Sequence, residues 1–185
     1  EILKCGLIKN KKIIKNLIFN KNFIFKKKFK ILEKLISETL KTKIYFFKND
    51  IYENNIRLNL NFGHTFAHAY EMSTQKIYNK EVIRHGEAVG LGMLSEILYS
   101  NSGKKNKVYY QCKKILEMYN LPTNLKTYNS KSNLMDLTYQ NLFLDKKKIS
   151  QFPRYIKLNS IGNPKISEMQ NTNLINDVLY KILGY

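Results

Sequence analysis

Apolar and polar residues follow one another mostly with the three- and four-residue spacing of amphipathic helices. This spacing runs through residues 2–48 and predicts consecutive helices there. A polar turn at residues 49–55 (NDIYENN) should separate them from a helix that begins near Gly63, with Phe66, Ala69 and Tyr70 on its apolar face. We expect residues 73–84 to form a polar connection after that helix.

The second half of the chain continues the helical pattern and then departs from it. Helices are predicted at residues 87–99, 108–119, 132–144 and 173–183. Gly103 is a plausible helix cap in the SNSG turn, and Pro122 cannot continue the helix before it. Residues 154–167 instead alternate over a short period, contain β-branched residues and include a GNP turn, which indicates a small β-hairpin. The sequence therefore predicts one mainly helical domain over residues 1–185.

Composition narrows the class of protein. The chain has 185 residues and is 43% hydrophobic, enough for one globular domain. No apolar run reaches the roughly 18–20 residues of a membrane span, and no secretory signal is evident. The only cysteines, Cys5 and Cys112, have no partner spacing, so we expect two buried free thiols and a cytoplasmic protein.

The net charge of +18 raises the alternative of a basic helical nucleic-acid-binding domain. Against it, the lysines are spread along the whole chain and greatly outnumber the arginines, which base and phosphate recognition tends to favour. The densest run, KNFIFKKKFK at residues 21–30, is interpreted as a solvated helix face, with a phosphate-binding patch as the alternative. Nucleic acid is therefore not the expected partner.

The three histidines carry most of the candidate chemistry. His64 and His68 are four residues apart, so on a helix they project from the same face and could be core side chains or ligands of one metal. His85 opens a helix rich in small residues that allow a neighbouring backbone to approach closely. These small residues are Gly86, Ala88, Gly90 and Gly92.

A row of polar residues leads up to the first histidine pair. Arg57, Asn61, His64 and His68 follow steps of four, three and four, which is one continuous face if the whole segment is helical. Arginine binds anions, asparagine forms neutral hydrogen bonds, and histidine binds metals or transfers protons. Such a row suits a phosphorylated, hydroxyl-rich substrate beside a divalent cation.

Several ordered motifs resemble the 3-dehydroquinate synthase family of sugar-phosphate cyclases. The strings RLNLNFGHTFAHAYE and HGEAVGLGM carry most of the resemblance. EILKCGLI at the start, Lys43 fourteen residues before Arg57, NLPTNL, and LDKKK followed by Ile161–Gly162 also match, so the resemblance covers essentially all 185 residues. The family pairs a C-terminal helical domain with an N-terminal α/β domain that binds NAD+. This chain starts at Glu1 without a methionine and has no strand–GxG–helix unit, so we expect a C-terminal fragment.

The resemblance implies a role for individual residues. Glu1, His64 and His85 would bind a divalent metal, Zn²⁺ or Co²⁺, and His68 would contact substrate beside it. The substrate's carboxylate, phosphate and hydroxyls would be held by Lys4, Lys43, Arg57, Asn61 and Lys146. Lys147 or Lys148 could take the last of these positions. No NAD+-binding residue is expected in this chain, because that site lies mainly in the N-terminal half.

The resemblance also implies a reaction. The family converts 3-deoxy-arabino-heptulosonate 7-phosphate to 3-dehydroquinate and phosphate, in the second step of the shikimate pathway towards chorismate and the aromatic amino acids. This lyase reaction uses transient oxidation by NAD+, phosphate elimination and aldol closure, in an enzyme expected to be a homodimer. We expect the fragment alone neither to bind NAD+ tightly nor to turn over. A sister sugar-phosphate cyclase or a metal-dependent polyol dehydrogenase is the alternative within the same fold.

Overall fold

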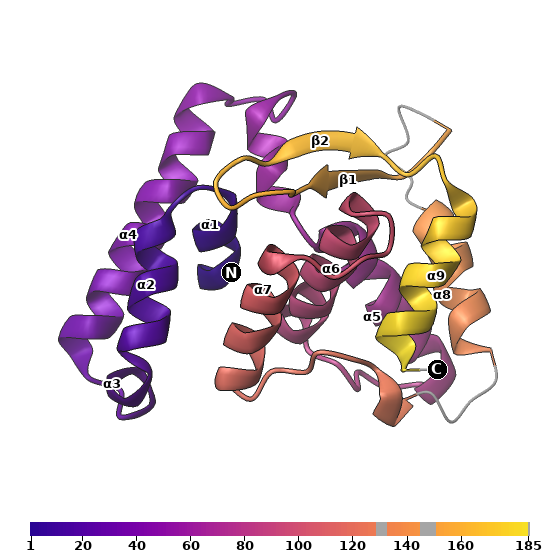
Figure 1. The fold of residues 1–185 in the computed structure, drawn as a ribbon, viewed down its shortest axis with the longest axis horizontal. Helices are drawn as coiled ribbons and strands as arrows, with labels where there is room; N and C mark the ends of the chain where they lie inside the picture. Colours follow the sequence, from indigo (N-terminus) through magenta and orange to yellow (C-terminus); the bar gives the residue numbers. More distant parts are fainter. Residues whose placement is uncertain (129–132, 145–150, 185) are drawn as a thin grey trace.

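Helices make up most of the chain in the computed structural model, which describes residues 1–128, 133–144 and 151–184 (Figure 1). One two-stranded antiparallel sheet accompanies them, so the predicted mainly helical fold with a small hairpin is confirmed. The elements are α1 Ile2–Ile8, α2 Lys11–Phe19, α3 Lys21–Phe25, α4 Phe29–Asn49, the 3₁₀ helix η1 Ile56–Asn61, α5 His64–Tyr78, α6 His85–Ser100, α7 Lys107–Met118, the 3₁₀ helix η2 Lys126–Tyr128, α8 Leu134–Phe143, β1 Arg154–Lys157, β2 Lys165–Glu168 and α9 Thr172–Leu183.

Helix α6 is the centre of the core. Its residues from Ala88 to Tyr99 are all buried, and α5, α7, α9 and β1 pack around it. The predicted apolar face of α5 is buried against this core, and the Tyr70 hydroxyl lies 2.7 Å from the Ser95 hydroxyl of α6. Both cysteines are buried free thiols, as expected.

Two glycines let α5 and α6 approach very closely. Gly63, just before α5, has a left-handed φ of 85°, which favours glycine. A Cβ on Gly92 of α6 would lie 1.9 Å from the Gly63 carbonyl oxygen and 3.0 Å from the Ala67 nitrogen. The predicted close approach at the small-residue helix is therefore confirmed. It brings the N-terminus of α5 directly against α6.

The polar connection predicted at residues 73–84 is wrong for its first part, because α5 continues to Tyr78. The hydroxyls of Ser73 and Thr74 donate hydrogen bonds of 2.7 Å to the carbonyl oxygens of Ala69 and Tyr70, one turn earlier. These polar side chains are satisfied within the helix and can be buried, so they do not end it.

Helices α1, α2 and α4 form a separate layer on one side of α6 and α7 (Figure 1). The hairpin joins the two layers. Gly162 in its turn donates a backbone hydrogen bond of 2.8 Å to Leu7 of α1, while Ile156 of β1 donates one of 2.9 Å to the Glu96 carboxylate of α6. The hairpin therefore fixes α1, which begins next to Glu1, relative to the histidine-bearing helices.

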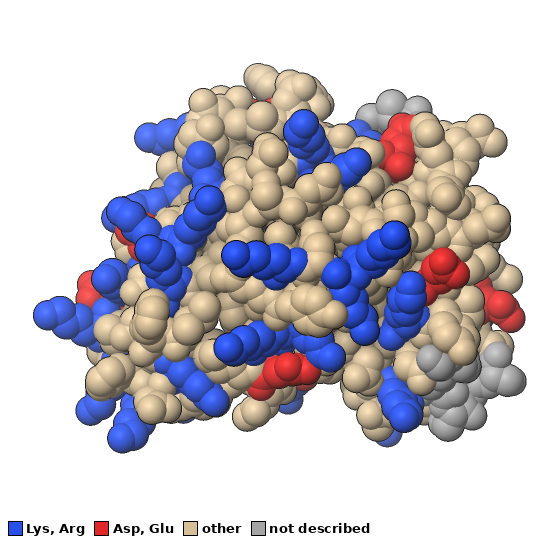
Figure 2. All heavy atoms as spheres, in the orientation of Figure 1, with Lys and Arg blue, Asp and Glu red and all other residues tan. Residues whose placement is uncertain are grey.

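The basic side chains do not gather in one patch on the face drawn in Figure 2, where neutral surface separates them. Every residue of the 21–30 run except Ile24 is exposed, as expected for a solvated helical segment. Within the described ranges, no helix combines the length and the hydrophobicity that crossing a membrane requires.

Glu96 is an unusual carboxylate in the core. Its side chain is fully buried, and within the described part of the chain its Oε1 has no hydrogen-bond partner. Burial raises the pKa of Glu96 to about 8, although nearby backbone N–H groups of Ile156, Gly63 and Thr65 favour the charged form. The folded protein therefore holds this proton up to a higher pH than the unfolded chain does.

Glu96→Gln is expected to remove a pH-dependent loss of stability. Between the ordinary pKa of 4.5 and the folded value of about 8, the folded state binds a proton that the unfolded state has released. Stability from Glu96 is thus complete below about pH 4.5 and is lost as the pH rises to about 8, by on the order of 4 kcal/mol. Urea unfolding of both proteins at pH 5, 6.5 and 8 measures this. If the difference in free energy of unfolding between wild type and Glu96→Gln is the same at all three pH values, the prediction is wrong.

Candidate metal and substrate site

The structure brings all three histidines of the chain together. Helix α5 supplies His64 at its first position and His68 one turn later, and α6 begins with His85. The ring centroid of His64 lies 5.4 Å from that of His85 and 5.8 Å from that of His68, while His68 and His85 are 6.2 Å apart. The close packing of α5 on α6 places the two helix starts side by side.

Two of these rings are oriented through Nδ1. The Nδ1 atom of His85 lies 2.8 Å from Oε1 of Glu71, and that of His64 lies 3.3 Å from the Phe62 carbonyl oxygen. Both rings therefore have Nε2 left for another partner. Histidines that bind metals in proteins are usually held in this way, by a carboxylate or carbonyl at the second nitrogen.

The role of Glu71 was missed in the sequence analysis, although it closes the HAYE string. It lies seven residues after His64 and three after His68, so all three project from one face of α5. This spacing was the available signal. The contact to His85 depends on how α6 packs and could not be predicted from spacing alone.

Glu1 is held by two lysines. Oε1 of Glu1 lies 2.7 Å from Lys4 Nζ, and Oε2 lies 2.5 Å from Lys43 Nζ. Burial alone would raise the pKa of Glu1, but hydrogen bonds from the two ammonium groups outweigh it and lower the pKa to about 2. Lys4 is buried, and Glu1 compensates its charge.

The donor set has the chemistry of a zinc or cobalt site. Burial, followed by repulsion from Lys4, lowers the pKa of His64 to about 4, so its imidazole is neutral at pH 7. Glu1 is ionised, and His85 has Nε2 available. In the described ranges no three of the His, Cys, Asp and Glu side chains form an arrangement that could hold a metal ion. The donor types therefore fit the metal, while a closed coordination cage is not formed.

The segment is not helical throughout, so the condition under which Arg57 and Asn61 would share one face with the histidines is not met. Helix η1 ends at Asn61, and the left-handed Gly63 interrupts the helix before His64. Glu53 joins the two residues instead. Its Oε1 accepts a hydrogen bond of 3.1 Å from Asn61, and its Oε2 lies 3.4 Å from the Arg57 guanidinium.

Arg57 packs on α4 one helical turn after Lys43. The Arg57 guanidinium carbon lies 4.6 Å from the ring centroid of Phe47, one helical turn after Lys43. Arg57 also donates a hydrogen bond of 2.6 Å to the Ile51 carbonyl oxygen. Of the predicted cations, Lys4 and Lys43 therefore contact Glu1, Arg57 packs on α4 one turn after Lys43, and Lys146 lies outside the described residues.

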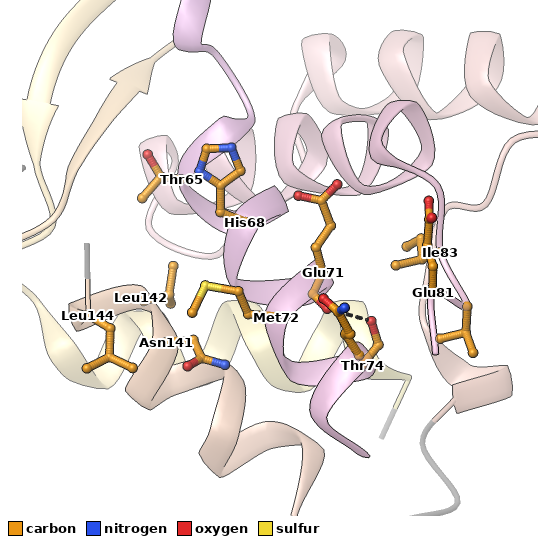
Figure 3. Close-up of a pocket in the computed structure, with 12 residues that line it drawn as sticks. Thr65, His68, Glu71, Met72, Thr74, Glu81, Ile83, Asn141, Leu142 and Leu144 are labelled. Carbon is orange, nitrogen blue, oxygen red and sulfur yellow. Dashed lines mark hydrogen bonds between the residues drawn. The ribbon is translucent and has the colours of Figure 1, made fainter. Parts of the chain in front are cut away.

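A pocket of about 640 Å³ lies beside this cluster, along α5 and next to α8 (Figure 3). His68 and Glu71 line one end of it, and Met72 and Leu142 contribute apolar surface. Among the described lining residues there is no lysine or arginine, and Glu81 adds a second carboxylate. This pocket is therefore not suited to a phosphate, and the anion-binding groups lie near Glu1 instead.

The chain is similar to known proteins over most of its length. Residues 1–148 match the family model described as 3-dehydroquinate synthase C-terminal. The 3-dehydroquinate synthase of Sulfurimonas denitrificans is 36% identical over 154 residues, which cover 82% of this chain and 42% of that protein. The enzyme of Clostridium beijerinckii is 32% identical over 176 residues, covering 94% and 46%.

Two solved structures have a similar fold. The 2-epi-5-epi-valiolone synthase of Streptomyces hygroscopicus subsp. jinggangensis, with NAD+ and Zn²⁺ bound, superposes with a TM-score of 0.78 at 16% identity, covering 98% of this chain and 49% of that one. A 2-deoxy-scyllo-inosose synthase complexed with carbaglucose-6-phosphate, NAD+ and Co²⁺ gives a TM-score of 0.66 at 25% identity, covering 83% and 43%.

The family match extends over most of the chain and includes every predicted site residue from Glu1 to His85. The chain spans about half the length of the curated relatives it matches. This chain therefore belongs to the 3-dehydroquinate synthase family and corresponds to the C-terminal part of its members.

Proposed function

We propose that this chain is the metal- and substrate-binding half of a 3-dehydroquinate synthase, which converts 3-deoxy-arabino-heptulosonate 7-phosphate to 3-dehydroquinate and phosphate. The observation that carries the proposal is that the histidine cluster lies near Glu1 and the lysine Lys4 that pairs with it. Repulsion from Lys4 helps to lower the pKa of His64 and attraction to Glu1 opposes that shift, which supports a shared site for the proposed metal ligands and anion-binding groups.

Glu1, His64 and His85 are the residues that would hold the metal, Zn²⁺ or Co²⁺. The bound metal would polarise substrate hydroxyl and ketone oxygens, and NAD+ would accept and return a hydride. Solved relatives of this fold were obtained with NAD+ and one of these two metals. The NAD+ site is expected mainly in the half of the relatives that this chain does not span.

The basic residues supply what a phosphorylated sugar acid requires. Lys43 lies on α4, and Arg57 packs on the same helix one turn later; these two cations would bind the two anionic groups of the substrate, and Asn61 would bind a hydroxyl. Lys4, buried against Glu1, holds that carboxylate ionised. Lys146 is expected to complete the set.

His68 is proposed to transfer protons. Its ring centroid lies 5.8 Å from that of His64, and it also lines the pocket along α5 (Figure 3). A histidine in this position can accept or donate a proton during the elimination and ring-opening steps.

Phosphate release by a complete two-domain protein tests the proposal. The N-terminal half of the Sulfurimonas denitrificans synthase, joined ahead of Glu1, should release phosphate from 3-deoxy-arabino-heptulosonate 7-phosphate in the presence of NAD+ and Zn²⁺. Glucose 6-phosphate, which lacks the carboxylate, should be a poor substrate. Preference for it would favour a sister cyclase, and turnover by the 185-residue chain alone would contradict the expected dependence on a second half.

Glu71→Gln is expected to weaken Zn²⁺ binding about 10- to 100-fold, because the charge that orients His85 through Nδ1 is lost. Isothermal titration of the 185-residue chain at pH 7 measures the affinity. Glu81→Gln is the matched control, since Glu81 lines the same pocket without a described contact to a histidine. Equal affinities for wild type and Glu71→Gln would show that Glu71 does not position a ligand.

A further inference from the structure

Helix α4 turns its more apolar side to solvent. Its buried face consists of Leu35, Thr39, Thr42 and Phe46, so half of that face is polar. The opposite surface carries large apolar side chains at helical spacing, each about half exposed or more. We refer to these residues as the α4 stripe: Phe29, Ile36, Leu40, Ile44 and Phe47.

The buried threonines do not require this orientation. The Thr39 hydroxyl donates a hydrogen bond of 2.7 Å to the Leu35 carbonyl oxygen, and the Thr42 hydroxyl donates one of 2.9 Å to the Glu38 carbonyl oxygen. Both hydroxyls therefore donate to carbonyl oxygens of their own helix, and in the described part of the chain no hydrogen bond from another element to them is seen. Leaving the α4 stripe in water instead costs hydrophobic free energy, and contiguous exposed patches of this kind mark interaction sites.

The α4 stripe has the form of a docking groove. An open depression of about 570 Å³ runs along it, and its described lining comes entirely from α4. A helix of 21 residues is about 31 Å long, comparable to the width of a small domain. The groove therefore fits a folded body lying along the helix better than it fits a small ligand. Its lining residues are Phe29, Leu32, Glu33, Ile36, Ser37, Leu40, Lys41 and Ile44.

The α4 stripe also reaches the candidate site. Lys43, which holds Glu1, lies on α4 directly beside Leu40 and Phe47, the latter one turn further on. The guanidinium of Arg57 packs on the Phe47 ring. A body seated on the α4 stripe would therefore cover the edge of the site and reduce the exposure of both cations to water.

Charge argues against a second copy of this chain as the occupant. Exposed lysines run alongside the stripe at positions 30, 34, 41 and 48, and the chain as a whole carries +18. Two copies facing each other across the stripe would bring these rows together, which is unfavourable. The occupant should instead present apolar residues rimmed by carboxylates.

We propose that the α4 stripe is the docking surface for the domain that makes up the other, N-terminal half of the family's members. The relatives are about twice as long as the part that this chain matches, so each of them contains a further half that can occupy the α4 stripe. This inference rests on family membership and the exposed face of α4, and it does not depend on the proposed reaction.

Thiol labelling tests the docking surface without substrate or metal. Cys5 and Cys112 are fully buried, so an introduced cysteine is the readily labelled thiol. Leu40→Cys should react quickly with a maleimide in the 185-residue chain. It should react at least about tenfold more slowly once the N-terminal half of the Sulfurimonas denitrificans synthase is joined ahead of Glu1. Asn176→Cys on α9, across the molecule from α4 in Figure 1, is the control and should react equally in both proteins.

Equal labelling of Leu40→Cys in both proteins would overturn the proposal. The proposal would also be overturned if Leu40→Cys in the 185-residue chain alone were labelled more slowly as the protein concentration rises, because a second copy would then cover the stripe. Thermal unfolding gives an independent readout. The pair Ile36→Ser and Leu40→Ser should leave the Tm of the 185-residue chain unchanged and lower that of the joined protein, and an equal change in both would refute docking at this face.

Discussion

Gly92→Ala is expected to lower the free energy of unfolding by at least about 3 kcal/mol, and the chain is expected to lose cooperative folding at moderate temperature. The added methyl group would lie 1.9 Å from the Gly63 carbonyl oxygen, which is backbone and cannot rotate away. Helices α5 and α6 would have to separate, and with them His64 and His85. Urea unfolding followed by circular dichroism measures the loss.

The same helix offers a matched control for this substitution. A Cβ at Gly86 would meet no atom within 4 Å, so Gly86→Ala should change stability by less than about 1 kcal/mol. If Gly92→Ala were as stable as Gly86→Ala, the close packing of α5 on α6 would not be what aligns the histidines.

The sequence pattern predicts most of the helices well because α2, α5, α7 and α9 each bury an apolar face in the core, whereas α4 shows the same spacing with much of its apolar surface exposed. The end of α5 was misplaced for a physical reason. Ser73 and Thr74 look like loop residues, but their hydroxyls bind carbonyl oxygens one turn back and Asn141 of α8 donates a further hydrogen bond to Ser73. Spacing cannot distinguish a polar residue in a loop from one satisfied inside a helix.

For the candidate site, the sequence led to the expectation that the three histidines lie together, but it did not indicate the contacts that hold the surrounding residues. The grouping of His64, His68 and His85 was expected from the resemblance to the family, because the spacing alone left core side chains and a metal pair as alternatives. The contacts of Glu53 with Arg57 and Asn61, and of Glu71 with His85, depend on the turn at Gly63 and on helix packing. Neither is encoded in the local pattern. The partner of Lys4, Glu1, is only three residues away, but the burial of Lys4 depends on how α1 packs against its neighbours.

His64→Ala and His85→Ala are each expected to abolish measurable Zn²⁺ binding at pH 7. Loss of a ligand should cost more than the roughly 10- to 100-fold that loss of an outer partner costs. The neutral His64 ring and the His85 ring held by Glu71 are the two donors with Nε2 available. Isothermal titration with Zn²⁺ measures the affinity. Preserved circular dichroism and urea midpoint show that a loss does not come from unfolding.

The comparison of His68→Ala with His64→Ala in the same Zn²⁺ titration tests the central claim most directly, because the two residues lie one turn apart on α5. We predict that His68→Ala keeps Zn²⁺ affinity within about tenfold of wild type, while His64→Ala loses binding. Loss of Zn²⁺ in His68→Ala with retention in His64→Ala, or no Zn²⁺ binding by the wild-type chain, would contradict the assignment of the site.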